Sequence, residues 1–436
     1  MSGRVGMGAL GWRSNAVSGE TCQYIQKFFE FIPTYESHYD GGLKVKKYFS
    51  PSLNLVLLHK IFLQRYPALK GRVKYDFFKL YFHTHFDISF GSPQVDVCSK
   101  CEELKVKLKN PHASLAEKEN AAARLLGHTN KAKKYYDKIK TIREQSREND
   151  AIMGISFDYM QNLPLPHLPV QEVFYLRQLW VYPFCIDNMG TNEVQFYTYH
   201  EGQALKGPNE VASFACNYIT HNTPDSVTEI HIFCDGCSGQ NRNGPLIKCL
   251  LAIVASKQIK INLYFPQRGH SFNDCDRDFG VVKRKVKRED RIFTPDEYYK
   301  LITEASKCKK FKVKRVRPNK ILRSYGRSVP KENKVTFHVT EYFQFEFRPE
   351  TPGLVVCRKT IGSELTEEFN LVKNRNSLPS LPTVPDFQCY DTKLLINILK
   401  IEDIKKLAVY IPPEASSFYE SLFEWPSTNA AEVEEA

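Results

Sequence analysis

Residues 229–241 read EIHIFCDGCSGQN, a short strand-like run that ends in an acidic turn. The alternating apolar residues of 229–235 predict a buried strand, and the Gly-Cys-Ser-Gly that follows predicts a turn. Residues 152–158 read IMGISFD and have the same character. We therefore expect two buried strands that each end in an aspartate, Asp158 or Asp235.

The segments around these two strands alternate between strand and helix patterns. Further strands are expected at 174–186, 192–199 and 259–265, and helices at 207–220, at 243–256 and from about residue 273. In a sheet with the order β-β-β-α-β-α-β-α, the first and fourth strands lie side by side. We therefore predict an α/β fold of the ribonuclease H-like type, a mixed sheet flanked by helices.

A third carboxylate is expected from the helix after the last of these strands, which opens with Asp274, Asp276 and Asp278. Asp276 and Asp278 flank the apolar stripe of this helix, while Asp274 lies further round; we prefer Asp276 and keep the other two as alternatives. Three neighbouring carboxylates repel one another unless divalent cations neutralise them. Asp158, Asp235 and Asp276 therefore predict a Mg²⁺ or Mn²⁺ site for phosphodiester cleavage, although each alone could shape a turn or cap a helix.

Three polar residues beside these aspartates are further site candidates. Gln240 and Asn241 stand at a helix entrance, where amide groups could hold a phosphate; a helix cap is the alternative. His270 precedes the acidic helix, where it could protonate a leaving group or assist a metal. A structural histidine in a turn is the alternative.

Several short stretches within residues 30–300 share their pattern with a known family. They are Ser37-His38-Tyr39, Asn54-Leu55, Ser89-Phe90-Gly91-x-Pro93, Asp96-x-Cys98-x-x-Cys101, Asp158-Tyr159-Met160-Gln161-x-Leu163-Pro164, Cys234-Asp235-Gly236-Cys237-x-Gly239-Gln240-Asn241, and Gly269-His270-Ser271 with Asp276. In these stretches the chain resembles transposon-derived animal proteins, mostly of unknown function, with a ribonuclease H-like domain of the DDE transposase type. The resemblance implies Asp158, Asp235 and Asp276 as metal ligands. Members of this family often begin further upstream, so the resemblance implies that this chain lacks an N-terminal DNA-reading segment.

A second metal site is predicted from cysteine and histidine spacing. Cys98 and Cys101 stand at the start of a helix, and His128 follows 27 residues later, beyond a helical turn. Two thiolates and an imidazole are three ligands of a tetrahedral Zn²⁺ site. The candidates for a fourth ligand are His38, His83, His85 and Cys22. The alternative is a pair of thiols with no ligand role.

The net charge of +12 is concentrated in one segment. Residues 283–327 hold 17 Lys and Arg against 5 Asp and Glu, a difference of +12, so the rest of the chain is neutral. Such a segment suggests DNA as the partner. The alternatives are a solvated linker and a nuclear import signal. We also predict that the protein is nuclear. The residues expected to contact DNA here are Lys283, Arg284, Lys285, Lys287, Arg288, Lys309, Lys310, Lys312, Lys314, Arg315 and Arg317.

Composition shifts along the 436 residues suggest six segments. They are a disordered lead-in at 1–20, a helical region with the zinc site at 21–150, the ribonuclease H-like core at 151–300, a basic and β-rich segment at 301–376, a linker at 377–390, and a helical unit with an acidic tail at 391–436. Within the helical region, Ser114 and Glu117 predict a capping box between two helices.

The longest apolar runs, such as residues 249–255, are too short to cross a bilayer, and no signal peptide is evident. We therefore expect a soluble intracellular protein without a membrane partner. Its twelve cysteines are expected to be reduced, apart from a metal site. Nothing in the sequence decides the oligomeric state, and a homo-oligomer stays open.

Three functions are compatible with these features. The preferred hypothesis is a transposase-derived, metal-dependent nuclease or strand-transferase that acts on DNA through an aspartate triad. The first alternative is a domesticated, non-catalytic DNA-binding or scaffold protein that keeps the fold. The second is a thioredoxin-like oxidoreductase at Cys234-x-x-Cys237, which would require a thiol of low pKa.

Overall fold

The computed structural model describes residues 19–36, 47–91, 98–191, 193–321, 337–371, 373–375, 378–380 and 388–429. The chain divides into two compact units, residues 1–102 and 103–436. The division falls inside the continuous helix α4 (Ser99–Lys109), most of which belongs to the second unit. Several predicted features lie outside the described ranges: the lead-in before residue 19, His38, the basic residues after 321, linker residues 381–387 and the acidic residues after 429.

The first unit has a core rich in phenylalanine. Its helices are α1 (Gly19–Phe31), α2 (Leu55–Arg65), α3 (Tyr75–His85) and the short 3-10 helix η1 (Pro67–Leu69). Strands β1 (Tyr35–Glu36), β2 (Lys47–Phe49) and β3 (Ile88–Phe90) form a small sheet. The fully or nearly fully buried rings are those of Phe28, Phe29, Phe49, Phe62, Phe78 and Phe82.

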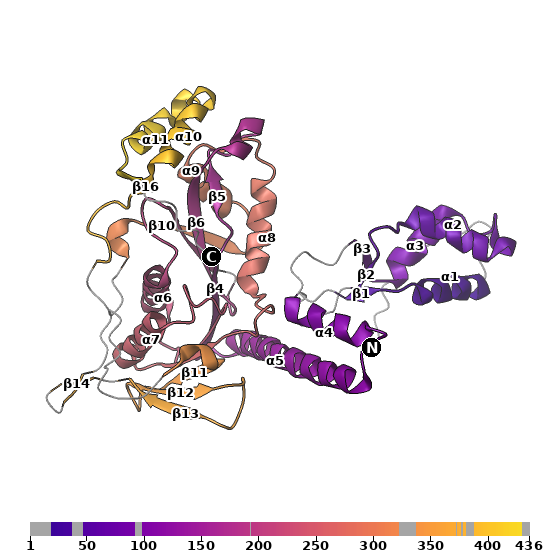
Figure 1. Cartoon of the computed structure of the whole chain (residues 1–436), viewed down its shortest axis with the longest axis horizontal. Coiled ribbons are helices and arrows are strands. Elements are labelled where there is room, and N and C mark those ends of the chain that lie inside the picture. The colour runs from indigo at the N-terminus through magenta and orange to yellow at the C-terminus, as the bar shows by residue number, and fades with distance from the viewer. Residues whose placement is uncertain are drawn as a thin grey trace, which may run out of the picture. The chain divides into compact units, whose positions relative to one another are not determined.

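The second unit is built on one large mixed sheet, to which ten of the described strands belong (Figure 1). Its central strands run in the order β7 (Glu193–His200), β6 (Leu179–Asn188), β4 (Ile152–Tyr159), β8 (Glu229–Cys234) and β9 (Lys260–Tyr264). Strand β4 is antiparallel to β6 and parallel to β8, and β8 is parallel to β9. The α/β class with a mixed sheet flanked by helices is therefore confirmed, and the first and fourth predicted strands are neighbours.

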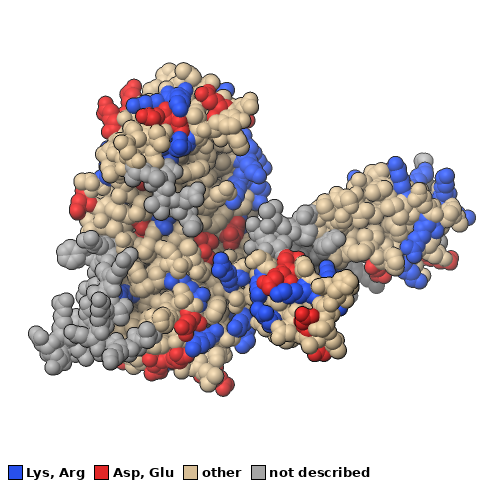
Figure 2. Space-filling model, in the orientation of Figure 1, with Lys and Arg blue, Asp and Glu red and all other residues tan. Residues whose placement is uncertain are grey.

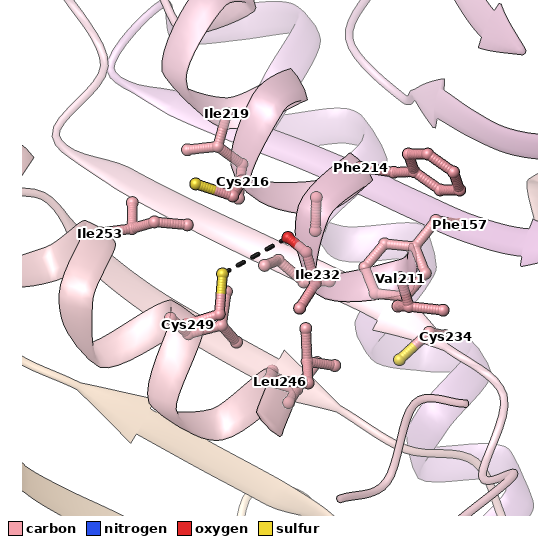
Figure 3. Packing of buried hydrophobic residues seen from close by; sticks show 14 of the residues in the cluster. Phe157, Val211, Phe214, Cys216, Ile219, Ile232, Cys234, Leu246, Cys249 and Ile253 are labelled. Atoms are coloured by element: carbon pink, nitrogen blue, oxygen red, sulfur yellow. Dashed lines mark hydrogen bonds between the residues drawn. The ribbon is translucent and has the colours of Figure 1, made fainter. Parts of the chain in front are cut away.

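Helices cover both faces of this sheet because successive side chains of a strand point to opposite sides. On one face, Ile155 and Phe157 of β4 pack against α6 (Pro208–Asn222) and α7 (Gly244–Lys257) in the main hydrophobic core (Figure 3). On the other face lies α8 (Asp274–Val286), where the Cys275 thiol donates to the Ser156 carbonyl at 3.4 Å.

The sheet extends beyond this centre on both sides. Strand β10 (Lys310–Arg315) pairs in parallel with β7, and β11 (Gln344–Phe347), β12 (Leu354–Arg358) and β13 (Glu367–Asn370) continue the sheet beyond β9. The short β5 (Leu163–Leu165) pairs with β6, and β14 (Lys373–Arg375) pairs with β15 (Leu378–Ser380). The sequence did not reveal β10, because its basic residues conceal the alternation of Phe311 and Val313.

One predicted strand differs from the structure. Residues 174–186 were expected to form a single strand, whereas residues 171–175 form the 3-10 helix η2 (Gln171–Tyr175) and β6 begins only at Leu179. Phe174 and Tyr175 are 84% and 73% exposed, so their aromatic character reflects neither a strand nor a core position.

A helical hairpin precedes the first central strand. Helix α4 (Ser99–Lys109) leads through a short turn to α5 (Leu115–Glu148). The predicted capping box is confirmed: the Ser114 hydroxyl accepts from the Glu117 N–H at 3.3 Å, and the Glu117 carboxylate accepts from the Ser114 N–H at 2.8 Å. The buried side of α5 packs on Phe233 and Tyr264 of the sheet.

The last described segments pack on the face of the sheet that α8 covers. Helix α9 (Pro295–Thr303) follows α8, and the C-terminal helices are α10 (Ile398–Lys406) and α11 (Pro413–Phe423), joined by the 3-10 helix η5 (Leu407–Tyr410). Strand β16 (Ile396–Asn397) pairs with β17 (Ser427–Thr428) beside them. Two further 3-10 helices are η3 (Pro318–Lys320) and η4 (Val339–Glu341). Helices are thus present in this stretch, as its apolar spacing predicts, and they belong to the second compact unit.

Gly154 sets how closely α5 approaches β4. A Cβ at this position would lie 2.7 Å from Ile142 Cγ2 and 2.9 Å from Ser146 Oγ. We expect Gly154→Ala to lower the free energy of unfolding by about 1–3 kcal/mol, because the helix must move away from the sheet. Gly244→Ala is the control, since a Cβ there would meet nothing within 4 Å. Equal unfolding midpoints of the two variants in urea would contradict this prediction.

Candidate functional site

Two aspartates meet at the ends of neighbouring parallel strands. Phe157 of β4 stands opposite Cys234 of β8, so Asp158 and Asp235 follow at equivalent positions. The residues before them, Phe157 and Cys234, both point into the core on the α6–α7 side. Alternation therefore turns Asp158 and Asp235 to the opposite face of the sheet, which α8 covers.

The third aspartate comes from the first turn of α8. Burial, and then the negative charges of Asp235 and Asp276, raise the pKa of Asp158 well above its usual range. Burial and the charge of Asp235 also raise the pKa of Asp276. All three side chains are partly exposed. The structure thus brings together three carboxylates that solvent can reach and that repel one another.

The other two aspartates of α8 have different partners. Asp274 is 5% exposed and forms an ion pair with Arg143 at 2.8 Å. Asp278 is 2% exposed and lies 3.1 Å from the Lys309 ammonium. Both are buried and neutralised by a cation, whereas the Asp276 carboxylate accepts from the Asn273 N–H at 2.9 Å and faces Asp235. Of the three sequence alternatives, the geometry favours Asp276.

The loop after β8 orients Asp235. The Asn241 side-chain amide donates to Asp235 Oδ1, and the Cys237 N–H lies 3.4 Å from the same oxygen. Asn241 is 1% exposed, so its amide is turned to the aspartate and away from a solvent-borne phosphate. Gln240, the other predicted phosphate contact, is partly exposed at the surface of this loop. Asn241 thus fixes the orientation of Asp235.

Lys206 is a site residue that the sequence did not reveal. Its ammonium group donates to Asn162 Oδ1 at 3.0 Å and lies 5.0 Å from the centre of the Tyr159 ring. Its positive charge lowers the pKa of both Asp158 and Asp235, which places it near the two carboxylates. A single lysine before a helix carries no spacing signal, so only the fold could identify it.

A cleft of about 530 Å³ opens beside Asp235. The loop after β8 forms one wall, and residues 266–271 of the loop before α8 form another. Arg242 lines the cleft with its guanidinium held over the Phe343 ring at 4.5 Å. Asp235 is thus open to solvent through this cleft, whose lining includes neither Asp158 nor Asp276.

The predicted DNA-contacting residues fall into two groups. Those on β10 mostly have partners within the protein: Lys310 and Lys312 pair with Glu193 at 3.5 and 2.6 Å, and Arg315 pairs with Asp296 at 3.0 Å. The other partners are Asn217 for Lys314, Glu304 for Lys285, and Asp187 and Asp278 for Lys309. The second group, Lys283, Arg284, Lys287, Arg288 and Arg317, is exposed.

The predicted cysteine and histidine site is present as a cluster. The ligand atoms of Cys98, Cys101, His128 and His270 all lie within 4.8 Å of one another, and such a cluster could hold a metal ion. Within the described residues, it is the one group of three or more candidate ligands that meets this distance. The fourth member of this cluster is His270, for which the sequence suggested a role in protonating a leaving group or assisting a metal, and His83, His85 and Cys22 are not part of the cluster.

The thioredoxin-like alternative requires a reactive thiolate at Cys234-x-x-Cys237. Cys234 is fully buried, and burial together with the charges of Asp235 and Asp158 raises its pKa well above the usual range. Such a thiol is not a nucleophile at neutral pH. The structure therefore argues against this alternative.

Comparisons of the chain with protein-family models, with curated proteins and with solved structures found no match. The resemblance to transposon-derived proteins therefore stays a prediction, as do the DNA partner and the nuclear location. No helix in the described part of the chain is both long enough and apolar enough to cross a membrane.

Proposed function

We propose that this chain is a metal-dependent nuclease or strand-transferase that acts on DNA through Asp158, Asp235 and Asp276. The observation that carries the proposal is the convergence of these three carboxylates: burial, and then the charges of Asp235 and Asp276, raise the pKa of Asp158. Carboxylates that repel one another in a solvent-facing site are typical of a site that holds divalent cations, and P-O bond chemistry is a common use of such a site. The site residues thus suggest a present or ancestral phosphodiester enzyme.

The strand order supports a ribonuclease H-like fold. The central order β7-β6-β4-β8-β9, with β6 antiparallel to both neighbours and β4, β8 and β9 parallel, is the arrangement we expect for that core. It gives the acidic residues on β4, after β8 and on α8 a common meeting point. This agreement also supports the proposed origin from a DDE-type transposase.

The donor set fits hard divalent cations. Carboxylate oxygens are the ligands that Mg²⁺ and Mn²⁺ prefer, and two such ions would offset the charges that now repel. The three carboxylates do not form a group within 4.8 Å, so ion binding would draw them closer. When bound, such ions supply an activated water and a stabilised leaving oxygen.

The surrounding residues serve this site in distinct ways. Asn241 holds one oxygen of Asp235 and so fixes the direction of the other. Lys206, beside Asp158 and Asp235, would attract a phosphate and favour the ionised carboxylates. Neither residue needs to transfer a proton.

A basic track leads away from the site along α8. Asp276, Gly280, Lys283 and Lys287 are spaced by four, three and four residues, so they share one face of the helix. Gly280 adds no side chain to that face, and the Arg284 guanidinium lies beside it, 3.7 Å from where a Cβ would stand. Figure 2 shows Lys and Arg side chains gathered over the upper part of α8. A DNA backbone on this face would reach Asp276.

We expect the double variant Lys283→Ala/Lys287→Ala to bind DNA more weakly and with a shallower salt dependence. Each lost phosphate contact reduces the steepness of a plot of log binding constant against log salt concentration by about 0.9. The loss of two contacts should therefore reduce this steepness by about 1.8. The matched control is Lys310→Ala/Lys312→Ala, because both lysines already pair with Glu193. Fluorescence anisotropy over a salt series measures the slopes, and equal losses in both double variants would contradict the proposed track.

The function is tested by incubating the full chain with supercoiled DNA in Mn²⁺, in Mg²⁺ and in EDTA. We expect nicked product only with a divalent cation. DNA binding without nicking under all three conditions would overturn the enzyme and leave the domesticated, non-catalytic DNA-binding protein. Absence of binding as well would overturn DNA as the partner.

A further inference from the structure

We infer that Cys98, Cys101, His128 and His270 bind one structural zinc ion, and that this ion fastens the α4–α5 hairpin to the loop from which α8 begins. The inference goes beyond the proposed function, because it concerns a second metal of different chemistry. It also assigns the fourth ligand, which lies 142 residues beyond His128 in the sequence.

The geometry of the four ligand atoms suits a tetrahedral ion. Zinc bound by sulfur at about 2.3 Å and by nitrogen at about 2.0 Å has ligand atoms separated by about 3.3–3.8 Å. The four atoms here already lie within 4.8 Å of one another, so side-chain adjustments of about 1 Å would complete the site. Two thiolates with two imidazoles are a set that zinc favours over Mg²⁺ or Ca²⁺.

Burial makes a bound ion the simplest reason for this grouping. Cys98, Cys101 and His270 are 4%, 0% and 5% exposed, and the His128 and His270 rings have their centres 5.0 Å apart. All four ligand atoms meet at one point from three separate segments. Two thiols and two imidazoles that meet at one point are the donor set of a tetrahedral zinc site.

The local backbone presents the ligands in a suitable way. Cys98 and Cys101 bracket the first turn of α4, and His128 lies near the middle of α5, which returns alongside after the turn at Ser114. Helix entrances stabilise thiolates, which are the ligating form of cysteine. His270 is held in its turn by a hydrogen bond from its N–H to the Gln267 carbonyl at 2.9 Å.

The position of His270 links this site to the acidic one. Three residues after His270, Asn273 caps α8, and Asp276 follows within its first turn. An ion on His270 would therefore limit the movement of the loop that delivers Asp276. We expect this ion to act as a brace and to take no part in the reaction at the aspartates.

The test measures metal in the purified full chain and uses no nucleic acid, so it is independent of the proposed function. We expect about one zinc ion per chain by elemental analysis. Replacement by Co²⁺ should give the visible bands of tetrahedral cobalt and a thiolate charge-transfer band. Less than about a tenth of an ion per chain after purification and zinc addition, or a cobalt spectrum without thiolate bands, would overturn the inference.

Two ligand variants and two matched controls identify the residues. Cys101→Ser and His270→Ala should lower the zinc content at least about tenfold. Cys308→Ser and His221→Ala remove an exposed thiol and an exposed imidazole elsewhere, and should keep the full content. Full zinc in His270→Ala would overturn the assignment of the fourth ligand.

Hydrogen exchange of the unmodified chain covers the case in which a variant fails to fold. A strong chelator should speed amide exchange both in 98–130 and in 266–276, because one ion holds both segments. Faster exchange in 98–130 alone would show that the ion does not reach His270, and would overturn the proposed brace.

Discussion

Asp158→Asn is expected to abolish metal-dependent cleavage, by about 10³-fold or more, while DNA binding persists. Asparagine keeps the shape of the side chain but removes one of the negative charges that bind the cations. The net charge of the site becomes less negative, so the affinity for a DNA backbone should be unchanged or slightly higher. Nicking of supercoiled DNA in Mn²⁺ and anisotropy in EDTA measure the two effects.

The same variant has a stability signature that does not depend on activity. Since the fold raises the pKa of Asp158, the ionised carboxylate destabilises the native state at neutral pH. We therefore expect Asp158→Asn to melt at a higher temperature than the unmodified protein in EDTA. Mn²⁺ should raise the melting temperature of the unmodified protein, because it binds only the native site, and should have less effect on the variant.

The matched control is Asp225→Asn, which removes one carboxylate from an exposed position between α6 and β8. It should leave cleavage, melting temperature and the response to Mn²⁺ unchanged. If Asp158→Asn cleaved as fast as this control, the aspartate triad would not be the active site. If both variants lacked any response to Mn²⁺ while the unmodified chain responded, the metal would bind elsewhere.

Lys309→Met is expected to lower the free energy of unfolding by about 3–5 kcal/mol, because it leaves two buried carboxylates without their cation. The Lys309 ammonium lies 3.1 Å from Asp278 and contacts Asp187, and both aspartates are 2% exposed. Burial and the Asp187 carboxyl raise the pKa of Asp278 to about 8. One proton and one lysine together therefore neutralise the pair near neutral pH.

A second substitution tests this explanation. In Lys309→Met/Asp278→Asn the remaining Asp187 carboxylate accepts a hydrogen bond from the asparagine amide and faces no second charge. We expect the double variant to recover part of the lost stability in urea denaturation. A double variant less stable than Lys309→Met would contradict the role of carboxylate repulsion.

The pH dependence of stability follows from the same group. The pKa of Asp278 in the folded protein, about 8, lies above the usual pKa of an aspartate. At pH values between these two pKa values, the native state therefore binds more protons than the unfolded state. This contribution to stability is therefore present at about pH 4 and is lost as the pH rises toward 8. Asp278→Asn should make the melting temperature depend less on pH between about pH 4 and pH 8. An unchanged dependence on pH would contradict a proton bound by the Asp187 and Asp278 pair.

The basic residues show why charge along the chain did not single out the proposed DNA-binding surface. Lys309, Lys310 and Lys312 lie in the most basic stretch of the sequence, yet β10 brings each of them to an acidic partner far away in the chain. Lys283 and Lys287 stay exposed because they extend from the end of α8. A count of charges cannot separate the two groups, since Asp187 and Glu193, which pair with Lys309, Lys310 and Lys312, lie more than one hundred positions away.

The sequence by itself determined the order of the central strands and of the helices between them, the capping box at Ser114, and the aspartates at the ends of β4 and after β8. These features depend on alternation, helical spacing and residues a few positions apart, which local chemistry encodes. Only the tertiary structure decided that Asp276 joins the triad, that Asp278 is neutralised by Lys309, and that His270 completes the Cys98 cluster. Each of those outcomes depends on contacts between segments far apart in the chain, whose meeting is set by the packing of the whole sheet and its helices.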